Sequence, residues 1–389
     1  MQKVLFLAAW YPVRFDAMVG LFVKRHAEVV SRTHQVAVLH VTADDSNRKI
    51  IETEVQRVNG VLTVIVYFKN VTSKFFIFNR LCKGIYWLLA FLSGISIVMR
   101  QFGRPQCLHI HVLTLRLGCM AYLLSRMCRI PYFITEHSSY FLPEKNVHRN
   151  WVWTGITRWI TRQSQGVSTV SQRLRDAMQA RGYTNRHFMI VRNVVPDIFF
   201  QADPAYRSKE KVVFSNITCF DDRVKNISGL VRTVARLREH RTDFELRLIG
   251  TGPDKPAIEK LVADLGLTSQ IYFTGLLFDD QLVDEIILSD FTVLFSHYET
   301  MAVVIAESLA CGRPVVATRA GGIPELIGSA NGLLVEPGNE EDLLQQLLRM
   351  MDLYKNYNPI ELRSRAYNMF STQSVSEAFE KLYSFSNRK

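Results

Sequence analysis

Short runs of β-branched and apolar residues alternate with helical stretches along almost the whole chain. The runs that we interpret as strands span residues 3–8, 35–41, 62–68, 107–112, 132–135, 166–170, 188–193, 211–217, 244–250, 271–275, 291–296, 314–318 and 332–336. Strands that alternate with helices are typical of parallel sheets covered on both faces, and the pattern occurs twice here. We therefore predict an α/β fold with two doubly wound, Rossmann-like domains.

The chain has 389 residues, too many for one ordinary core and suited to two domains. We expect residues 1–197 to form an N-terminal domain and residues 198–373 a C-terminal domain, with the crossing near 195–210. The last helix, about 374–389, has no strand after it and is expected to pack back on the first domain. Ligands of such sheets bind beyond the carboxyl ends of the strands, so two such edges would face each other across a cleft.

Positive charge is concentrated in the N-terminal half. Residues 1–195 contain 26 Lys and Arg against 9 Asp and Glu, whereas residues 196–389 contain 21 against 27. This asymmetry indicates that the N-terminal half faces something anionic. The sequence has no nucleic-acid motif, so we expect no nucleic-acid partner and favour an anionic membrane surface or a phosphate-bearing lipid.

One apolar stretch, residues 73–104, bears on a membrane role. Its charge-free part, Gly84 to Met99, is 16 residues long, which is short of the ~20 residues needed to span a bilayer. We favour a buried helix that leads into the strand at 107–112. A transmembrane helix is the least favoured interpretation. A third possibility is an interfacial helix whose aromatic and basic flank contacts the membrane surface; this flank consists of Lys74, Phe75, Phe76, Phe78, Arg80 and Lys83.

The six cysteines are scattered and form no C-x-x-C pair, which favours reduced thiols in a cytosolic protein. The start "MQKVLFLAAWYP" has an apolar run of only seven residues with no small-residue cleavage site, so a buried first strand is expected rather than a signal peptide. We expect a cytoplasmic protein, peripheral on the inner face of the cell membrane.

The segment "LFSHYETMAVVIAESLACGRPVVATRAGGIPELI" holds two glutamates, Glu299 and Glu307, on either side of seven residues. We expect a helix from about Met301 to Cys311, with Glu299 just before it and the amides of 300–303 free to seat a phosphate. Glu307 would lie about two turns into this helix. A buried carboxylate needs partners, and either ribose hydroxyls or a salt bridge within the protein would supply them; in the second case Glu299 would only cap the helix.

The next loop repeats the arrangement. Gly321 and Gly322 allow a close backbone approach, and Pro324 suits the first turn of a short helix. Two helix N-termini at one place could hold a diphosphate without a metal. The sequence has no Asp-x-Asp motif, and His109 and His111 alone make a weak metal site. We therefore expect neither a metal nor a cofactor.

The E-x7-E spacing followed by "LACGRPVVATRAGGIPELI" resembles the signature of the retaining glycosyltransferases of family 4, which have the GT-B fold. Further segments that resemble this family are 20–30, 246–267, 271–277, "VSTVSQRLRDAM" and "IVRNVVPDIF". The likeness is strong in the C-terminal half and loose in the N-terminal half. It implies a retaining, metal-independent hexosyltransferase that uses a nucleotide diphosphate sugar and a glycan or lipid-linked acceptor, in cell-surface or extracellular polysaccharide biosynthesis. The N-terminal domain (1–197) would then bind the acceptor and the C-terminal domain (198–373) the donor.

The resemblance also implies roles for single residues. Glu307 would hold the donor ribose, Glu299 would lie near the donor sugar, and Lys225 would neutralise the diphosphate. His137 would face the transferred sugar, and Gly20 would let the backbone approach the phosphates. Further donor-binding positions are Thr300, Met301, Ala302, Val303, Gly250 and Gly275.

Two departures from the family pattern stand out. Residues 300–302 are Thr-Met-Ala where the family has Gly-Phe-Gly, and Phe220 stands where the family has an arginine. Arg223 is the candidate replacement for that arginine. The alternatives left open are a nucleotide-sugar epimerase of the same fold and a non-catalytic nucleotide-sugar-binding subunit.

Overall fold

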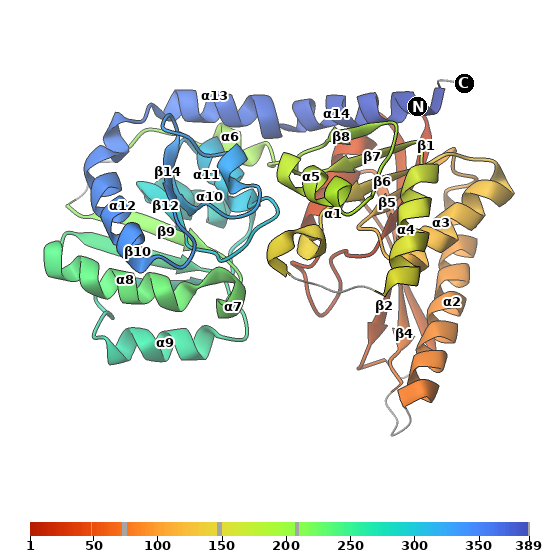
Figure 1. The fold of residues 1–389 in the computed structure, drawn as a ribbon, viewed down its shortest axis with the longest axis horizontal. Helices are drawn as coiled ribbons and strands as arrows, with labels where there is room; N and C mark the ends of the chain where they lie inside the picture. The colour runs from red at the N-terminus through yellow and green to blue at the C-terminus, as the bar shows by residue number, and fades with distance from the viewer. Residues whose placement is uncertain (48, 72–75, 146–149, 207–209, 388–389) are drawn as a thin grey trace.

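The computed structural model describes residues 1–47, 49–71, 76–145, 150–206 and 210–387, and these form two β-sheets with helices on both faces (Figure 1). In the described chain the first sheet has eight strands in the order β3-β4-β2-β1-β5-β6-β7-β8. Their bounds are β1 Lys3–Ala8, β2 Gln35–Asp44, β3 Ile51–Val58, β4 Val61–Lys69, β5 Cys107–His111, β6 Tyr132–Glu136, β7 Gly166–Thr169 and β8 Phe188–Ile190. All of its pairings are parallel except that of β3 with β4.

The strand β3 was missed by the sequence analysis. It is an edge strand with mostly polar, partly exposed side chains, so it lacks the apolar run that identified the other strands. The turn that joins it to β4 is Asn59-Gly60, and both residues have positive φ angles, 50° and 79°. Asn-Gly is the preferred sequence of a two-residue hairpin turn, and this signal was available in the sequence.

Helices cover the two faces of the N-terminal sheet, and β1 shows how its residues divide between them. Leu5 and Leu7 pack in one core cluster with residues of α2 Phe76–Gln101, α3 Leu115–Cys128 and α4 Trp151–Gln163. Val4 and Phe6 pack in another with residues of α1 Leu21–Ser31 and α14 Thr372–Ser384. Successive strand residues point to opposite faces, so one apolar strand supplies both cores.

The second sheet has six strands among the described residues, in the order β11-β10-β9-β12-β13-β14, all parallel. Their bounds are β9 Val212–Ile217, β10 Phe244–Ile249, β11 Ile271–Gly275, β12 Phe291–Leu294, β13 Val315–Thr318 and β14 Gly332–Val335. The helices of this part are α7 Asp222–Lys225, α8 Ile227–His240, α9 Lys255–Asp264, α10 Asp279–Leu288, α11 Val303–Ala310 and α12 Glu340–Leu353. The two parallel sheets confirm the predicted fold class.

The crossing between the sheets runs through α6 Ile198–Gln201, and the chain returns through α13 Pro359–Phe370. The helix α13 packs on α11, and α14 then packs on α1 and β7 of the first sheet, along the top of the molecule in Figure 1. The fully buried Arg313 holds the crossing segment, since its guanidinium donates to the carbonyls of Pro204, Ala205, Ile287 and Ser289. The exact division at 197/198 remains a prediction.

The helix α2 differs from the expectation of a buried helix. Within its candidate membrane segment, Asn79–Gln101, only 22% of the most apolar 18-residue window is buried, so that expectation was wrong. Of the predicted aromatic and basic flank, Lys74 and Phe75 lie outside the described residues, and the side chains of Phe76 and Phe78 are also not described.

Candidate active site

The loop after β12 brings Glu299 and Lys225 together. The ammonium of Lys225 donates to Oε1 of Glu299 at 2.5 Å, and Ser296 Oγ donates to the same oxygen at 3.0 Å. Burial disfavours the charged form of Lys225, but the Glu299 carboxylate outweighs this effect and raises the pKa of the lysine above its ordinary value. The site therefore holds a charged lysine that is positioned by a carboxylate.

The backbone of the same loop packs tightly on the next one. A Cβ at Gly321, where φ is +52°, would lie 1.5 Å from the carbonyl oxygen of Glu299, and one at Gly322 would lie 2.3 Å from that of Thr300. Only glycine allows this approach. The close backbone approach predicted at these two glycines therefore exists, and it is an approach to the backbone of the loop that contains Glu299.

The helix α11 begins at Val303, two residues later than predicted. Ala302 is its N-cap residue with φ −70° and ψ 100°, and the side chains of Met301 and Ala302 are buried in the core. Thr300 is partly exposed. The prediction that residues 301 and 302 belong to the helix was wrong, because Met301 is an apolar anchor of the loop.

Glu307 lies one turn into α11, not two, and is 3% exposed. Its Oε1 accepts a hydrogen bond of 2.7 Å from Arg25 on α1. The internal salt bridge that we left open therefore exists, and it joins the two halves of the molecule. The sequence analysis missed Arg25, although it lies in the segment 20–30 that resembles the family.

Two further contacts link the halves near this loop. The Glu325 carboxylate accepts hydrogen bonds from the amides of Gln172 and Arg173, the first two residues of α5 Gln172–Ala180, at 2.8 and 2.6 Å. Lys145 donates to the hydroxyl of Tyr298 at 2.7 Å. Residues 323–325 form a short 3₁₀ helix with Pro324 in its first turn, as predicted. That its N-terminus and that of α11 point at one place stays a prediction.

The predicted glycines occupy positions that exclude a side chain for different reasons. Gly20 precedes α1 with φ +66°, and a Cβ there would lie 2.4 Å from the backbone of Trp10. Gly250 has φ +134°, and a Cβ would lie 1.9 Å from the carbonyl oxygen of Thr218. Its amide donates to the carbonyl of Gly275, where φ is +80° and no atom lies within 4 Å of the Cβ position. Their donor-binding roles remain predictions.

Position 220 and its proposed substitute have different environments. Phe220 is fully buried in the core cluster of the second sheet, with its ring 6.2 Å from that of Phe273. Arg223 is exposed on α7, the short helix that ends at Lys225, and makes no ion pair within the described part of the chain. The structure thus leaves Arg223 free to turn toward an anion, and its role stays a prediction.

His137 follows β6 and lies in a buried group of imidazoles. Its Nε2 is 3.3 Å from Nδ1 of His111, and its ring lies 4.4 Å from that of Phe22. Burial holds the pKa values of His111 and His137 well below the ordinary value and lowers that of His26 to about 4. These side chains are neutral, so His137 presents a neutral hydrogen-bonding group at the strand end.

Three of these histidines could also hold a transition metal. Ring nitrogens of His26, His111 and His137 lie within 4.8 Å of one another, and imidazole suits Zn²⁺ and similar ions. His109 is not in the group, because it is hydrogen-bonded to Tyr383 and Thr135. Strand spacing pointed only to His109 and His111, whereas the group is assembled by three separate elements. The expectation of no metal stays a prediction.

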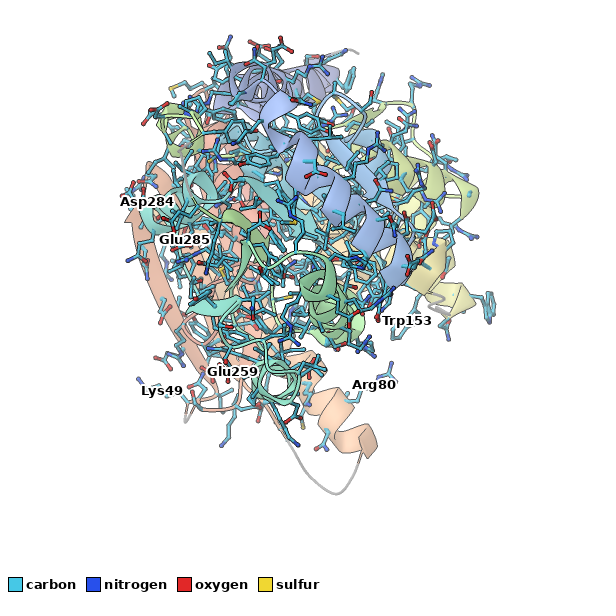
Figure 2. All side chains as sticks on the ribbon, turned by 90° about the vertical axis from the view of Figure 1, so that its left-hand side faces the viewer. Lys49, Arg80, Trp153, Glu259, Asp284 and Glu285 are labelled. Atoms are coloured by element: carbon cyan, nitrogen blue, oxygen red, sulfur yellow. The ribbon has the colours of Figure 1, made fainter. Side chains whose placement is uncertain are left out.

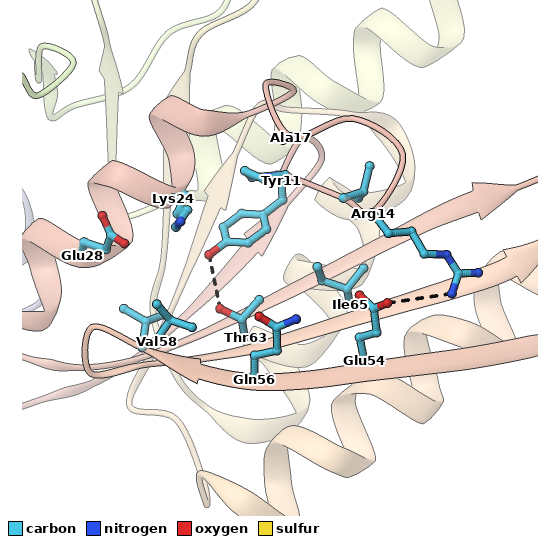
Figure 3. A pocket seen from close by; sticks show the side chains of 13 residues that line it. Tyr11, Arg14, Ala17, Lys24, Glu28, Glu54, Gln56, Val58, Thr63 and Ile65 are labelled. Atoms are coloured by element: carbon cyan, nitrogen blue, oxygen red, sulfur yellow. Dashed lines mark hydrogen bonds and ion pairs between the residues drawn. The ribbon is translucent and has the colours of Figure 1, made fainter. Parts of the chain in front are cut away.

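Two cavities open beside the first sheet. The larger, about 820 Å³, lies next to Ser138 at the ends of β1, β5 and β6, and Trp10, Trp87, Trp153 and Arg116 also line it. The smaller, about 300 Å³, lies between α1 and the β3–β4 hairpin (Figure 3).

Comparison with known proteins agrees with this architecture. The model described as "Glycosyltransferase Family 4" matches residues 22–197, and "Glycosyl transferases group 1" matches residues 211–352. The chain is 28% identical over 244 residues to the 2-deoxystreptamine glucosyltransferase of Streptomyces kanamyceticus, covering 59% of this chain and 63% of that protein.

A second relative is the N-acetylgalactosamine-N,N'-diacetylbacillosaminyl-diphospho-undecaprenol 4-alpha-N-acetylgalactosaminyltransferase of Campylobacter jejuni. It is 34% identical over 153 residues, covering 38% of this chain and 40% of that protein. The matches thus span less than two thirds of either relative.

Solved structures share the whole fold. HepE from Anabaena in complex with UDP-glucose superposes with a TM-score of 0.73 at 16% identity, covering 99% of this chain and 100% of that one. The two family models together span most of the chain and meet at the crossing between its sheets. The chain belongs to the glycosyltransferases of family 4, with the GT-B fold.

Proposed function

We propose that this protein transfers a hexosyl group from a nucleotide diphosphate sugar to a hydroxyl acceptor, with retention of the anomeric configuration. The observation that carries the proposal is the partly buried Lys225–Glu299 pair at the carboxyl end of the second sheet, one loop before α11. The UDP-glucose bound by HepE, a protein of the same fold, supports a nucleotide-sugar donor.

The chemistry assigned to these residues concerns departure of the diphosphate. The bond between the anomeric carbon and the phosphate oxygen breaks, and its electron pair leaves with the diphosphate, whose growing charge Lys225 stabilises. The acceptor oxygen then bonds to the same face of the carbon, and its proton passes to the leaving phosphate. Glu299 holds the Lys225 ammonium in position, and a phosphate oxygen of the bound donor then also accepts a hydrogen bond from it. The lysine thus supplies the positive charge, and no metal is required.

The acceptor that we propose is a lipid-linked glycan at the cytoplasmic face of the membrane, in polysaccharide assembly. The basic N-terminal half supports an anionic, membrane-borne acceptor. The partial likeness to a transferase whose name specifies a diphospho-undecaprenol substrate points the same way.

The test replaces Lys225 or Glu307 with alanine and measures transfer and donor affinity, with UDP-glucose as the first donor tried. We expect transfer to fall about 100-fold or more in the Lys225→Ala protein, since removing one charge-stabilising group typically costs this much. Lys260→Ala is the matched control, because Lys260 is an exposed lysine of the same domain.

Near-normal activity in both variants would refute the proposal. Loss of wild-type transfer in EDTA, restored by added metal, would refute metal independence. Incubation with donor alone tests the epimerase alternative, which needs no acceptor. Donor binding without turnover would instead favour a non-catalytic subunit. We consider this alternative because the loop that contains the buried Met301 departs from the family pattern.

A further inference from the structure

Exposed apolar side chains are concentrated on three neighbouring helices of the N-terminal domain. Trp151 is 83% exposed, Met127 80% and Leu81 62%, although residues of these types are usually buried. The exposed set, here named the apolar face, consists of Leu81, Ile85, Leu88, Leu89, Leu92 and Met99 on α2, Leu123 and Met127 on α3, and Trp151, Val152, Trp153, Ile156 and Trp159 on α4. A gathered patch of this kind marks a protein or membrane interaction site.

The helix α2 is apolar on two opposite sides. Phe91 and Val98 are buried against the sheet, and a Cβ at Gly94 would lie 2.4 Å from a methyl group of Leu39 on β2. This tight packing holds the helix on the sheet. The other side carries Leu81, Ile85, Leu88 and Leu92 at helical spacing and faces outward.

This geometry favours a helix that lies in the membrane surface over one that crosses the bilayer. Asn79–Gln101 is long and apolar enough for a span by length and composition. Spanning, however, would require α2 to leave β2 and β4, its partners in the core. An attached helix with an exposed apolar side is the arrangement of interfacial helices.

The charges around the apolar face have one sign. The segments of α2, α3 and α4 contain seven Lys and Arg and no Asp or Glu. Between Asn70 and Arg175 the only acidic residues are Glu136, which is fully buried, and Glu144. A basic, apolar surface complements anionic lipid headgroups, which attract nearby Lys and Arg side chains.

The larger cavity opens at the edge of the same face. Arg80 lies over the ring of Trp153 and Arg116 over that of Trp87, at 5.4 and 5.8 Å, and all four side chains line the cavity. Figure 2 shows Arg80 and Trp153 next to each other at the rim of this domain. A molecule held in the membrane surface would therefore reach the cavity, and Ser138 within it, without leaving the bilayer.

We propose that the apolar face of α2, α3 and α4 docks on an anionic lipid bilayer, and that docking places the mouth of the 820 Å³ cavity at the membrane surface. The docking proposal depends only on the exposed apolar side chains and the basic residues of these three helices. Only the entry of a lipid-linked acceptor through this mouth rests on the proposed function.

The experiment measures flotation of the full chain with vesicles of phosphatidylcholine alone and of phosphatidylcholine and phosphatidylglycerol in equal parts. We expect binding to the anionic vesicles at low salt, with a marked fall at high salt. Ile85→Glu should lower the partition by about tenfold or more, because it replaces an apolar side chain that would be buried in the bilayer by a charged one.

The matched control is Ile360→Glu, since Ile360 is an even more exposed isoleucine (70% against 47%) on α13, away from this face. It should bind as the wild type does. Thermal melting and UDP binding of all three proteins monitor folding and the donor domain. Failure of the wild-type protein to bind anionic vesicles, or equal losses in the two variants, would overturn the docking surface. Loss of UDP binding in the wild type would instead count against the proposed function.

Discussion

At the residue scale, each glutamate of the E-x7-E motif has its own cationic partner. Glu299 pairs with Lys225 inside the C-terminal domain, and Glu307 pairs with Arg25 from the other domain. Both pairs are largely buried, and a buried charge that loses its partner costs several kcal/mol. The sequence predicted that both carboxylates matter, but Arg25 is 282 residues from Glu307 and no local spacing could reveal it.

His40 gives a residue-scale prediction about pH. It is buried, its Nδ1 lies 2.9 Å from the carbonyl oxygen of Ala8, and burial lowers its pKa to about 4. The unfolded chain binds a proton near pH 6.5 and the folded one near 4, so His40 favours folding fully above pH 6.5 and loses this contribution as the pH falls toward 4. It should account for about 2 kcal/mol of the stability lost between pH 7 and pH 5.

Urea denaturation of the wild-type protein and of His40→Gln at both pH values measures this contribution. The loss between pH 7 and pH 5 should be smaller in the variant by that amount. The parallel substitution His240→Gln, at an exposed position, should leave the pH dependence unchanged. Equal pH dependence in all three proteins would show that His40 is not held neutral by folding.

At the element scale, apolar strands and amphipathic helices were predictable because each buries a run with a clear period. The edge strand β3 and the start of α11 were not, for opposite reasons. The side chains of β3 are too polar to show a hydrophobic period. Met301 fits the apolar pattern of the helix, but it lies in the preceding loop and is buried there. The sequence also did not predict that one side of α2 is exposed. A helix that is apolar on both sides has the same sequence pattern whether one side or both are buried.

Arg313 provides the prediction at this scale. It is fully buried, and its guanidinium donates to five backbone carbonyls in different directions, two of them in the crossing segment. An ammonium cannot reproduce this fork. Arg313→Lys should therefore lower the free energy of unfolding by roughly 2–4 kcal/mol, the cost of leaving two or so buried carbonyls unpaired.

Urea denaturation provides the measurement for Arg313→Lys. Arg232→Lys is the control, because Arg232 forms an exposed ion pair with Glu340, and such pairs contribute about 0–1 kcal/mol. A loss in Arg313→Lys no greater than in this control would contradict the anchoring role.

At the scale of the whole molecule, several polar contacts join the two domains beside α13 and α14. The Arg25–Glu307 pair, the Lys145–Tyr298 bond and the Glu325 contact with α5 all lie at the carboxyl ends of the two sheets. Relative motion is the default expectation for two domains of one chain. We expect these polar contacts to favour the closed arrangement of the two domains.

Glu325 gives the prediction at this scale. Its carboxylate satisfies the first two amides of α5 across the interface. Glu325→Ala should shift the molecule toward open arrangements, since hydrogen bonds to a charged group contribute about 1.5–3 kcal/mol each. Small-angle scattering should report a larger radius of gyration than for the wild type or for Glu239→Ala, which changes an exposed glutamate. Identical scattering from all three proteins would exclude a closing role for Glu325.

Local patterns were sufficient to predict the two largely parallel sheets, the crossing near residue 200 and the loop position of Glu299 after a strand, because each follows from hydrophobic periodicity. Glu307 and Lys225 were singled out by short motifs that resemble the family. Tertiary structure alone decided which side chains meet: Arg25 with Glu307, Glu325 with α5, and His26 with His111 and His137. It also decided that α2 keeps one side outside the core. The physical reason is distance along the chain, since contacts between remote elements depend on how the packed layers are arranged and leave no periodic trace in any one segment.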